Sequence, residues 1–209
     1  MSKYGYIGKD GPTQALKSNA GVLNPNDYKD LAANEQLLLP GQLELIETKT
    51  HSSDVNAVDF TSLGDYDVHF VTITNAGVDT NNKRIALRFR ENGTWETGTV
   101  YKYAHFYHYI SGTSELQSTG DSELEISFEV NSTSGNANSH VTIYDAIDST
   151  KNTFMHQETT RYNTSYSQIW GSGVLPQQSK VDGFRFFVSD SANFSSYTIS
   201  LYGVKSYGV

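Results

Sequence analysis

The chain has 209 residues, enough for one large all-β domain. Its 15 basic and 23 acidic residues give a formal net charge of −8, which argues against a nucleic-acid-binding protein held by phosphate contacts. The absence of cysteine excludes disulfides, thiolate catalysis and cysteine zinc sites, and an aromatic content of 12% argues against intrinsic disorder.

Residues 1–40 follow neither a strand period nor a helix period. Glycine and proline interrupt this stretch, and isolated apolar residues lie between them. Because such residues need a partner to cover them, we expect an extended N-terminal arm that docks into a neighbouring subunit. A loop-rich segment lying over its own domain would have the same composition. The expected contact residues of the arm are Tyr4, Tyr6, Ile7, Leu16, Leu23, Tyr28 and Leu31.

One short helix is expected inside this arm. Asn24 is suited to the N-cap, Pro25 to the first helical position and Asp27 to the first turn. The helix would run to about Gln36 and end before Pro40.

From Gly41 to the end of the sequence, apolar and polar residues alternate with period 2, the spacing of half-buried strands. About nine strands are expected in this second domain, 41–209, separated by clusters of Gly, Asn, Asp and Ser. The most regular alternation runs from Leu124 to Val130 and predicts a strand with Glu123, Glu125 and Glu129 on an exposed face.

The second domain is therefore expected to be an antiparallel two-sheet β-sandwich. No helical pattern of 10 to 15 residues separates the strands, so a parallel sheet is disfavoured. Polar residues on one face of several strands indicate antiparallel sheets with one solvated face. The simplest arrangement is a sandwich that resembles a jelly roll.

No sequence motif predicts catalysis. The six histidines form no metal-binding motif, and a nucleophile elbow and glycine-rich nucleotide loops are absent. We therefore expect no enzyme activity, no metal and no cofactor. The sequence also has no long apolar run and no apolar signal segment, so neither a membrane association nor export by a signal peptide is expected.

The segment 101–109 carries an unusual run of tyrosines. On a strand, Tyr101, Tyr103, Tyr107 and Tyr109 share one face with His105. Such a face can stack on sugar rings or form a subunit contact. It can equally pack against neighbouring strands inside the domain.

Several strings resemble virion structural proteins of tailed phages of marine bacteria, cyanophages above all. They are the leader Tyr4-Gly-Tyr-Ile-Gly8, the string that begins Gly41-Gln-Leu-Glu-Leu, and the ending Tyr197-Thr-Ile-Ser-Leu-Tyr-Gly-Val204. The resemblance covers both ends and the first strands, and it is weak between about residues 75 and 180. It implies a place in the particle and supplies no catalytic residues.

The first hypothesis is therefore a non-enzymatic virion protein, a capsid decoration (cement or knob) or a tail-appendage subunit. It would bind a major capsid or tail protein through residues 1–40, form a homo-oligomer, and leave the host cell by lysis. The alternative is a carbohydrate- or host-receptor-binding module of a fibre or tail tip, for which the tyrosine face, Trp95 and Trp170 are the motivating residues.

Overall fold

The computed structural model describes Lys29, residues 43–132 and residues 135–204. The chain divides into two units, Met1–Pro40 with Val209, and Gly41–Gly208, and the described strands belong to the second unit. Apart from Lys29, the expected arm and its helix lie outside the described residues, and so do all of the expected contact residues. Within the described ranges, no helix has both the length and the apolar character needed to cross a membrane.

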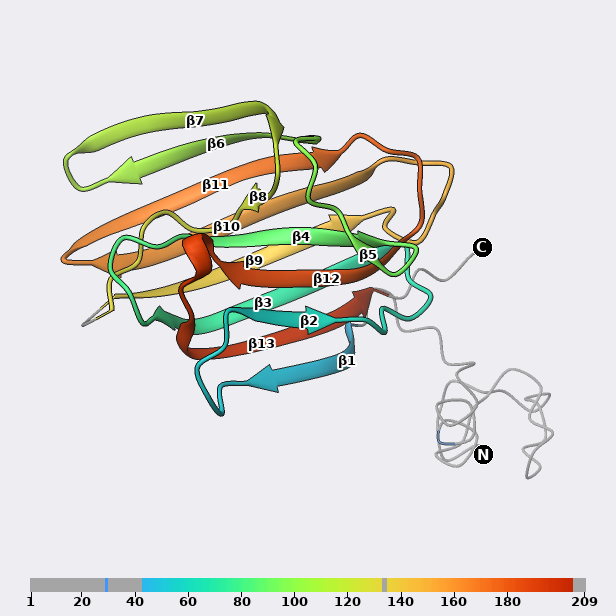
Figure 1. Cartoon of the computed structure of the whole chain (residues 1–209), viewed down its shortest axis with the longest axis horizontal. Helices are drawn as coiled ribbons and strands as arrows, with labels where there is room; N and C mark the ends of the chain where they lie inside the picture. Colours follow the sequence, from blue (N-terminus) through green and yellow to red (C-terminus); the bar gives the residue numbers. More distant parts are fainter. Residues whose placement is uncertain (1–28, 30–42, 133–134, 205–209) are drawn as a thin grey trace, which may run out of the picture. The chain divides into compact units, whose positions relative to one another are not determined.

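The described part is all-β, as the sequence predicts, and its strands form two antiparallel sheets (Figure 1). The larger sheet has eight strands in the order β1-β13-β3-β9-β10-β11-β6-β7. Their bounds are β1 Leu43–Thr50, β13 Phe194–Val204, β3 Val68–Val78, β9 Asn136–Tyr144, β10 Thr153–Asn163, β11 Ser165–Leu175, β6 Tyr101–Tyr109 and β7 Gly112–Asp121.

The smaller sheet has five strands and faces the larger one. Four of them follow the order β2-β12-β4-β5, and β8 pairs with the free part of β4. Their bounds are β2 Ala57–Phe60, β12 Val181–Val188, β4 Ile85–Glu91, β5 Thr94–Trp95 and β8 Leu124–Glu125. A short 3₁₀ turn, η1 (Ser189–Ser191), separates β12 from β13.

One hydrophobic core lies between the two sheets, an arrangement consistent with a β-sandwich. The alternation of β3 places His69, Val71 and Ile73 in this core. From the smaller sheet, the rings of Phe184 and Phe89 pack 5.8 Å apart between their centroids. The period-2 pattern of the sequence is therefore the pattern of core-facing side chains.

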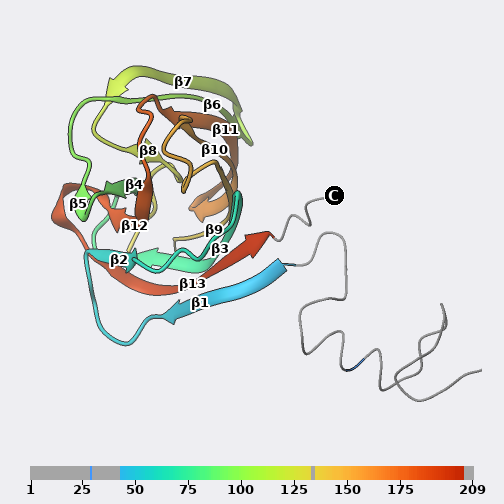
Figure 2. The ribbon, with the colours of Figure 1, turned by 90° about the vertical axis from the view of Figure 1, so that its right-hand side faces the viewer.

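The larger sheet extends well past β9. The hairpins β10–β11 and β6–β7 add four strands to its edge, and Figure 2 shows the sheet curving around the smaller one. The inner side of this extension meets β8 and the segment after it. At Gly173, an added Cβ would lie 2.5 Å from Leu124 Cδ2, so a side chain there would prevent this close approach.

The expected half-exposed strand from Leu124 to Val130 is wrong. Only Leu124–Glu125 forms a strand, and both residues are buried. Ser127 is also fully buried, because its hydroxyl accepts a hydrogen bond from the backbone N–H of Ile85. Glu125 and Ser127 alternate with apolar residues, but they bind partners inside the domain instead of water.

Candidate functional site

Strand β6 turns its tyrosines toward the interior. Tyr101 and Tyr107 are at most 2% exposed, and Tyr103 and Tyr109 are half-buried. The four residues share one strand face, as expected from the sequence, and this face packs against neighbours within the chain. A surface that stacks on sugars needs open ring faces, and Tyr101 and Tyr107 do not present them.

A buried polar network joins β6 to the smaller sheet. The Tyr107 hydroxyl donates to Glu125 Oε1 at 2.6 Å, and Arg84 Nη1 donates to Glu125 Oε2 at 2.9 Å. Burial raises the pKa of Glu125, although the Tyr107 hydroxyl and the Arg84 charge lower it. Both oxygens of this carboxylate are therefore occupied, and the network connects the two sheets.

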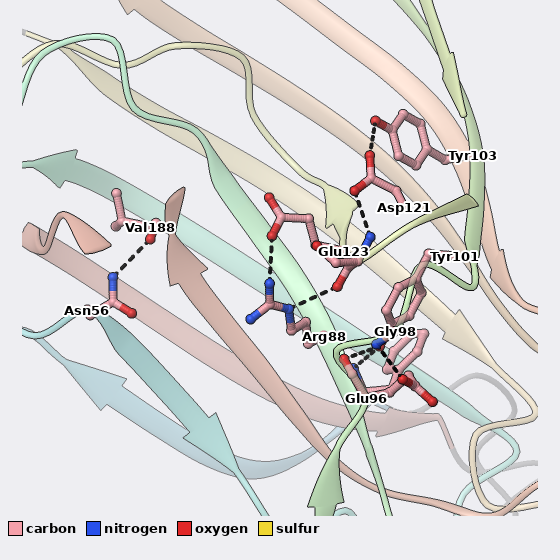
Figure 3. A network of polar contacts seen from close by, with 11 residues as sticks. Asn56, Arg88, Glu96, Gly98, Tyr101, Tyr103, Asp121, Glu123 and Val188 are labelled. Carbon is pink, nitrogen blue, oxygen red and sulfur yellow. Dashed lines mark hydrogen bonds and ion pairs between the residues drawn. The ribbon is translucent and has the colours of Figure 1, made fainter. Parts of the chain in front are cut away.

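A second polar network surrounds Arg88 on β4 (Figure 3). Arg88 Nε donates to the Ser122 carbonyl at 2.9 Å and Nη2 donates to Glu123 Oε2 at 3.0 Å, while the Tyr103 hydroxyl donates to Asp121 Oδ2 at 3.0 Å. The Arg88 bonds hold Ser122 and Glu123 against β4, and the Tyr103 bond ties Asp121 to β6. A polar hollow of about 420 Å³ beside them is lined by Asn56, Arg88, Asp121, Ser122, Glu123, Phe187, Val188, Ser189, Asp190 and Ser191.

The outer face of the smaller sheet is charged, and its charges are paired. Arg185 makes a bidentate contact with Asp59, with both N–O distances at 2.7 Å, and Arg90 Nε lies 2.7 Å from Asp182 Oδ1. The guanidinium of Arg185 also lies 4.2 Å above the ring of Trp95. Trp95, one of the two tryptophans expected to contact a ligand, is therefore stacked against a side chain of its own domain.

The outer face of the larger sheet has a different character. Its cross-strand register places six apolar residues in one continuous row, and Leu43, Tyr144 and Phe154 in that row are 47%, 40% and 48% exposed. The row ends at Lys102 and consists of Leu43, Val204, Val68, Tyr144, Phe154 and Val174. A cross-strand row of this kind forms an apolar stripe, which we call the outer stripe.

Charge is sparse on this face. Along the cross-strand rows that pass through Phe154, His156, Glu158 and Thr160, the formally charged side chains are Lys102, Glu115 and Glu158. Aromatic, threonine and histidine side chains occupy most other positions. Depletion of charge and enrichment of aromatic residues are typical of the centre of a protein interface, whereas the paired ions of the smaller sheet are typical of a hydrated surface.

Trp170 lies on the same outer face, two rows away from the outer stripe. It is 39% exposed, and its ring centroid lies 4.9 Å from that of Phe106. A shallow hollow of about 270 Å³ beside the two rings is lined by Ala104, His105, Phe106, Glu115, Leu116, Gln117, Trp170 and Gly171. Aromatic rings beside an amide and a carboxylate form a surface that can bind a sugar ring.

The histidines divide into two buried ones and a set that is more exposed. His69 Nε2 contacts the Leu63 carbonyl at 2.9 Å, and burial lowers its pKa. His105 is 3% exposed, both of its ring nitrogens lack a hydrogen-bond partner, and burial lowers its pKa to about 4. In the described ranges, no group of three or more acidic or histidine side chains is arranged to bind a metal ion.

Comparisons with known proteins give no family. No family model matches the chain, and no curated protein matches it.

Proposed function

We propose that this protein is a non-enzymatic structural subunit of a phage particle, either a capsid decoration or a tail appendage. Residues 1–40 would anchor it to a major capsid or tail protein, and the subunits would form a symmetric oligomer. The protein would be assembled into particles in the host cell, and the particles would be released by lysis. The observation that carries it is the contrast between the paired ions on one sheet and the charge-poor, aromatic face of the other.

The position of the outer stripe supports an anchoring role for the chain's N-terminal side. Leu43 and Leu45 are 47% and 56% exposed on edge strand β1, which directly follows the expected arm. Apolar side chains on an exposed edge strand favour contact with another chain unless they are covered. The apolar surface that includes Leu43 and Leu45 would therefore add to the particle contact that residues 1–40 are proposed to make.

We further infer a jelly-roll connectivity for the central strands. The strand order β1-β13-β3-β9 in one sheet and β2-β12-β4-β8 in the other supports it, because the chain crosses between the sheets at every step of this set except β4 to β8, as two Greek keys require. In this interpretation β6–β7 and β10–β11 are hairpins added to the edge of a jelly roll. This fold serves capsid proteins and also lectins, so it is compatible both with a particle subunit and with a glycan-binding module.

The anchoring proposal is tested by deleting residues 2–36 and mixing the product with particles that lack this protein. The truncated protein should lose particle binding, because the apolar residues of the arm are its expected contacts. A full-length Tyr144→Glu/Phe154→Glu variant should also bind at least about tenfold more weakly, since it places charge on the outer stripe. Binding is measured by co-sedimentation.

A matched control places the same two charges on and directly after β5 of the other sheet. Thr94 and Thr97 are exposed, and a Thr94→Glu/Thr97→Glu variant should bind particles like the unmodified protein. Unreduced binding by the truncated protein would rule out the anchor, and unreduced binding by the Tyr144→Glu/Phe154→Glu variant would rule out the stripe as an interface.

A second candidate function is binding of a host-surface glycan, and the Trp170–Phe106 hollow is the observation that favours it. Substituting Trp170 with Ala should weaken glycan binding at least about tenfold, the effect of losing about 1.4 kcal/mol of contact energy. The measurement is a glycan array followed by titration of any sugar that binds. Substituting buried Tyr107 instead would disturb the core.

Tyr162→Ala provides a control for this experiment, because Tyr162 is 51% exposed near the end of the β10–β11 hairpin. Its loss should leave sugar binding unchanged. The glycan proposal fails if no sugar binds, or if Trp170→Ala binds as well as the unmodified protein.

A further inference from the structure

The inner face of the extended sheet contains an arginine that has no counter-ion among the described residues. Arg161 on β10 is 7% exposed, and its Nε has no hydrogen-bond partner. A buried charge is costly unless it is paired and hydrogen-bonded. The guanidinium carbon lies 5.2 Å from the centroid of the Phe128 ring, and an aromatic ring supplies no hydrogen-bond acceptor of the strength that Arg needs.

Two other side chains share the cross-strand row of Arg161. Ser167 on β11 pairs directly with Arg161, and Tyr109 on β6 pairs directly with Ser167. Directly opposed residues have Cβ atoms about 5 Å apart, so the three side chains form one compact group. Ser167 is fully buried, and its hydroxyl also lacks a partner.

The acidic side chains nearby do not neutralise Arg161. Glu125 is the buried one, and its two oxygens bind Tyr107 and Arg84. Glu129 interacts with Arg161 electrostatically, but the two form no ion pair, and the net effect of burial is a lowered pKa of Arg161. Among the described residues, Glu129 thus attracts the Arg161 guanidinium electrostatically, but no acceptor forms a hydrogen bond or an ion pair with it.

We propose that the row Tyr109–Ser167–Arg161 binds a small oxyanion such as phosphate or a carboxylate. The guanidinium and the Ser167 hydroxyl donate hydrogen bonds, and guanidinium groups match planar or tetrahedral oxyanions closely. Half-buried Tyr109 forms the solvent side of the site. Two residues, Tyr162 and Asn163, separate Arg161 from Thr164 in the β10–β11 turn, so the row lies close to the hairpin end of these strands.

The experiment measures the melting temperature of the full chain at constant ionic strength while sodium phosphate, or sodium acetate, replaces sodium chloride. Above the dissociation constant, each tenfold rise in phosphate should raise the melting temperature by about 4 °C. Arg161→Met keeps an unbranched apolar stem at this position and removes the charge, so this variant should lose the response. A response to phosphate alone identifies a phosphate-type anion, and a response to acetate as well identifies a carboxylate-accepting site.

A second measurement keeps the proposal testable if Arg161→Met does not fold. The Nε–H signal of Arg161 in a ¹H–¹⁵N spectrum of the unmodified protein, assigned through Arg161→Lys, should shift on phosphate addition. An unmoved signal, or equal thermal responses of the unmodified protein and Arg161→Met, would overturn the proposal.

Glu129→Gln tests the competing internal partner. If an external anion occupies the site, this variant keeps or increases the phosphate response, because a nearby negative charge is removed. If Glu129 is the counter-ion in solution, Glu129→Gln lowers the melting temperature in phosphate-free buffer as much as Arg161→Met does, and that result would overturn the proposal.

Discussion

A Gly171→Val variant is expected to lose about 3 kcal/mol or more of unfolding free energy, because this position on β11 has no room for a side chain. A Cβ at Gly171 would lie 2.4 Å from the Ala104 carbonyl oxygen and 2.3 Å from His105 Cδ2. The first of these atoms belongs to the backbone of β6 and cannot turn away. In a chain of this size the melting temperature should fall by about 10 °C.

Ser172→Val is the matched control for this substitution. Ser172 is the next residue of β11 and is exposed on the outer face, where a β-branched residue suits a strand. Its effect should stay within about 0.5 kcal/mol. Equal stability of Gly171→Val and Ser172→Val in urea unfolding would contradict the close approach of β6 and β11.

Replacing His105 with Phe should reduce the loss of stability in acid. The pKa of His105 is lowered to about 4 by burial, while the unfolded chain has an ordinary value near 6.5. Between these values the unfolded state binds the proton and the folded state does not, so stability is complete above about pH 6.5 and falls as the pH drops toward about 4. From pH 7 to pH 4.5, the unmodified protein should lose about 2.5 kcal/mol more than the variant.

Other groups also change the unfolding free energy in this pH range. Their effects are the same in the unmodified protein and in His105→Phe, so the difference between the two isolates His105. Buried His69 adds to the loss in acid, because its pKa is also lowered. Glu125 acts in the opposite direction, because its pKa is raised and its ionisation destabilises the fold as the pH increases. A His108→Phe variant serves as the control, since His108 lies on the same strand and is exposed. Equal acid sensitivity of His105→Phe and the unmodified protein would refute the prediction.

The sequence correctly predicts which residues share a face of β6. It does not predict whether the tyrosine face points to the core or to solvent. Alternation alone places Tyr101, Tyr103, Tyr107 and Tyr109 on one side. Whether that side meets the core or solvent depends on the curvature of the extended sheet and on Glu125, which accepts the Tyr107 hydrogen bond from another sheet. A contact between two sheets is a tertiary property, and no local pattern in the sequence encodes it.

The same limit explains the error at Leu124–Val130. Alternating acids predict a half-exposed strand when water is assumed to be their partner. In the folded chain Glu125 binds Arg84 and Tyr107, and Ser127 binds the backbone of Ile85. Polar residues that bind partners inside a protein produce the same pattern as polar residues that face water.

The sequence does not predict the outer stripe, because the stripe depends on the register between distant strands. Leu43 and Val174 stand 131 positions apart in the sequence and lie in one row through the pairings of β1, β13, β3, β9, β10 and β11. The exposed leucines of β1 are a local signal. Their alternation with Glu44 and Ile46 is visible in the sequence, but it does not indicate which side of the strand faces solvent.

The central proposal, a structural subunit of a phage particle, is tested most directly by quantitative mass spectrometry of purified particles. A structural subunit should be present in a fixed number of copies per particle that survives repeated purification. Hundreds of copies would indicate a capsid lattice, and a few to a few dozen would indicate a tail, collar or fibre. Absence of the protein from purified particles, with its presence in the lysate, would contradict a structural role.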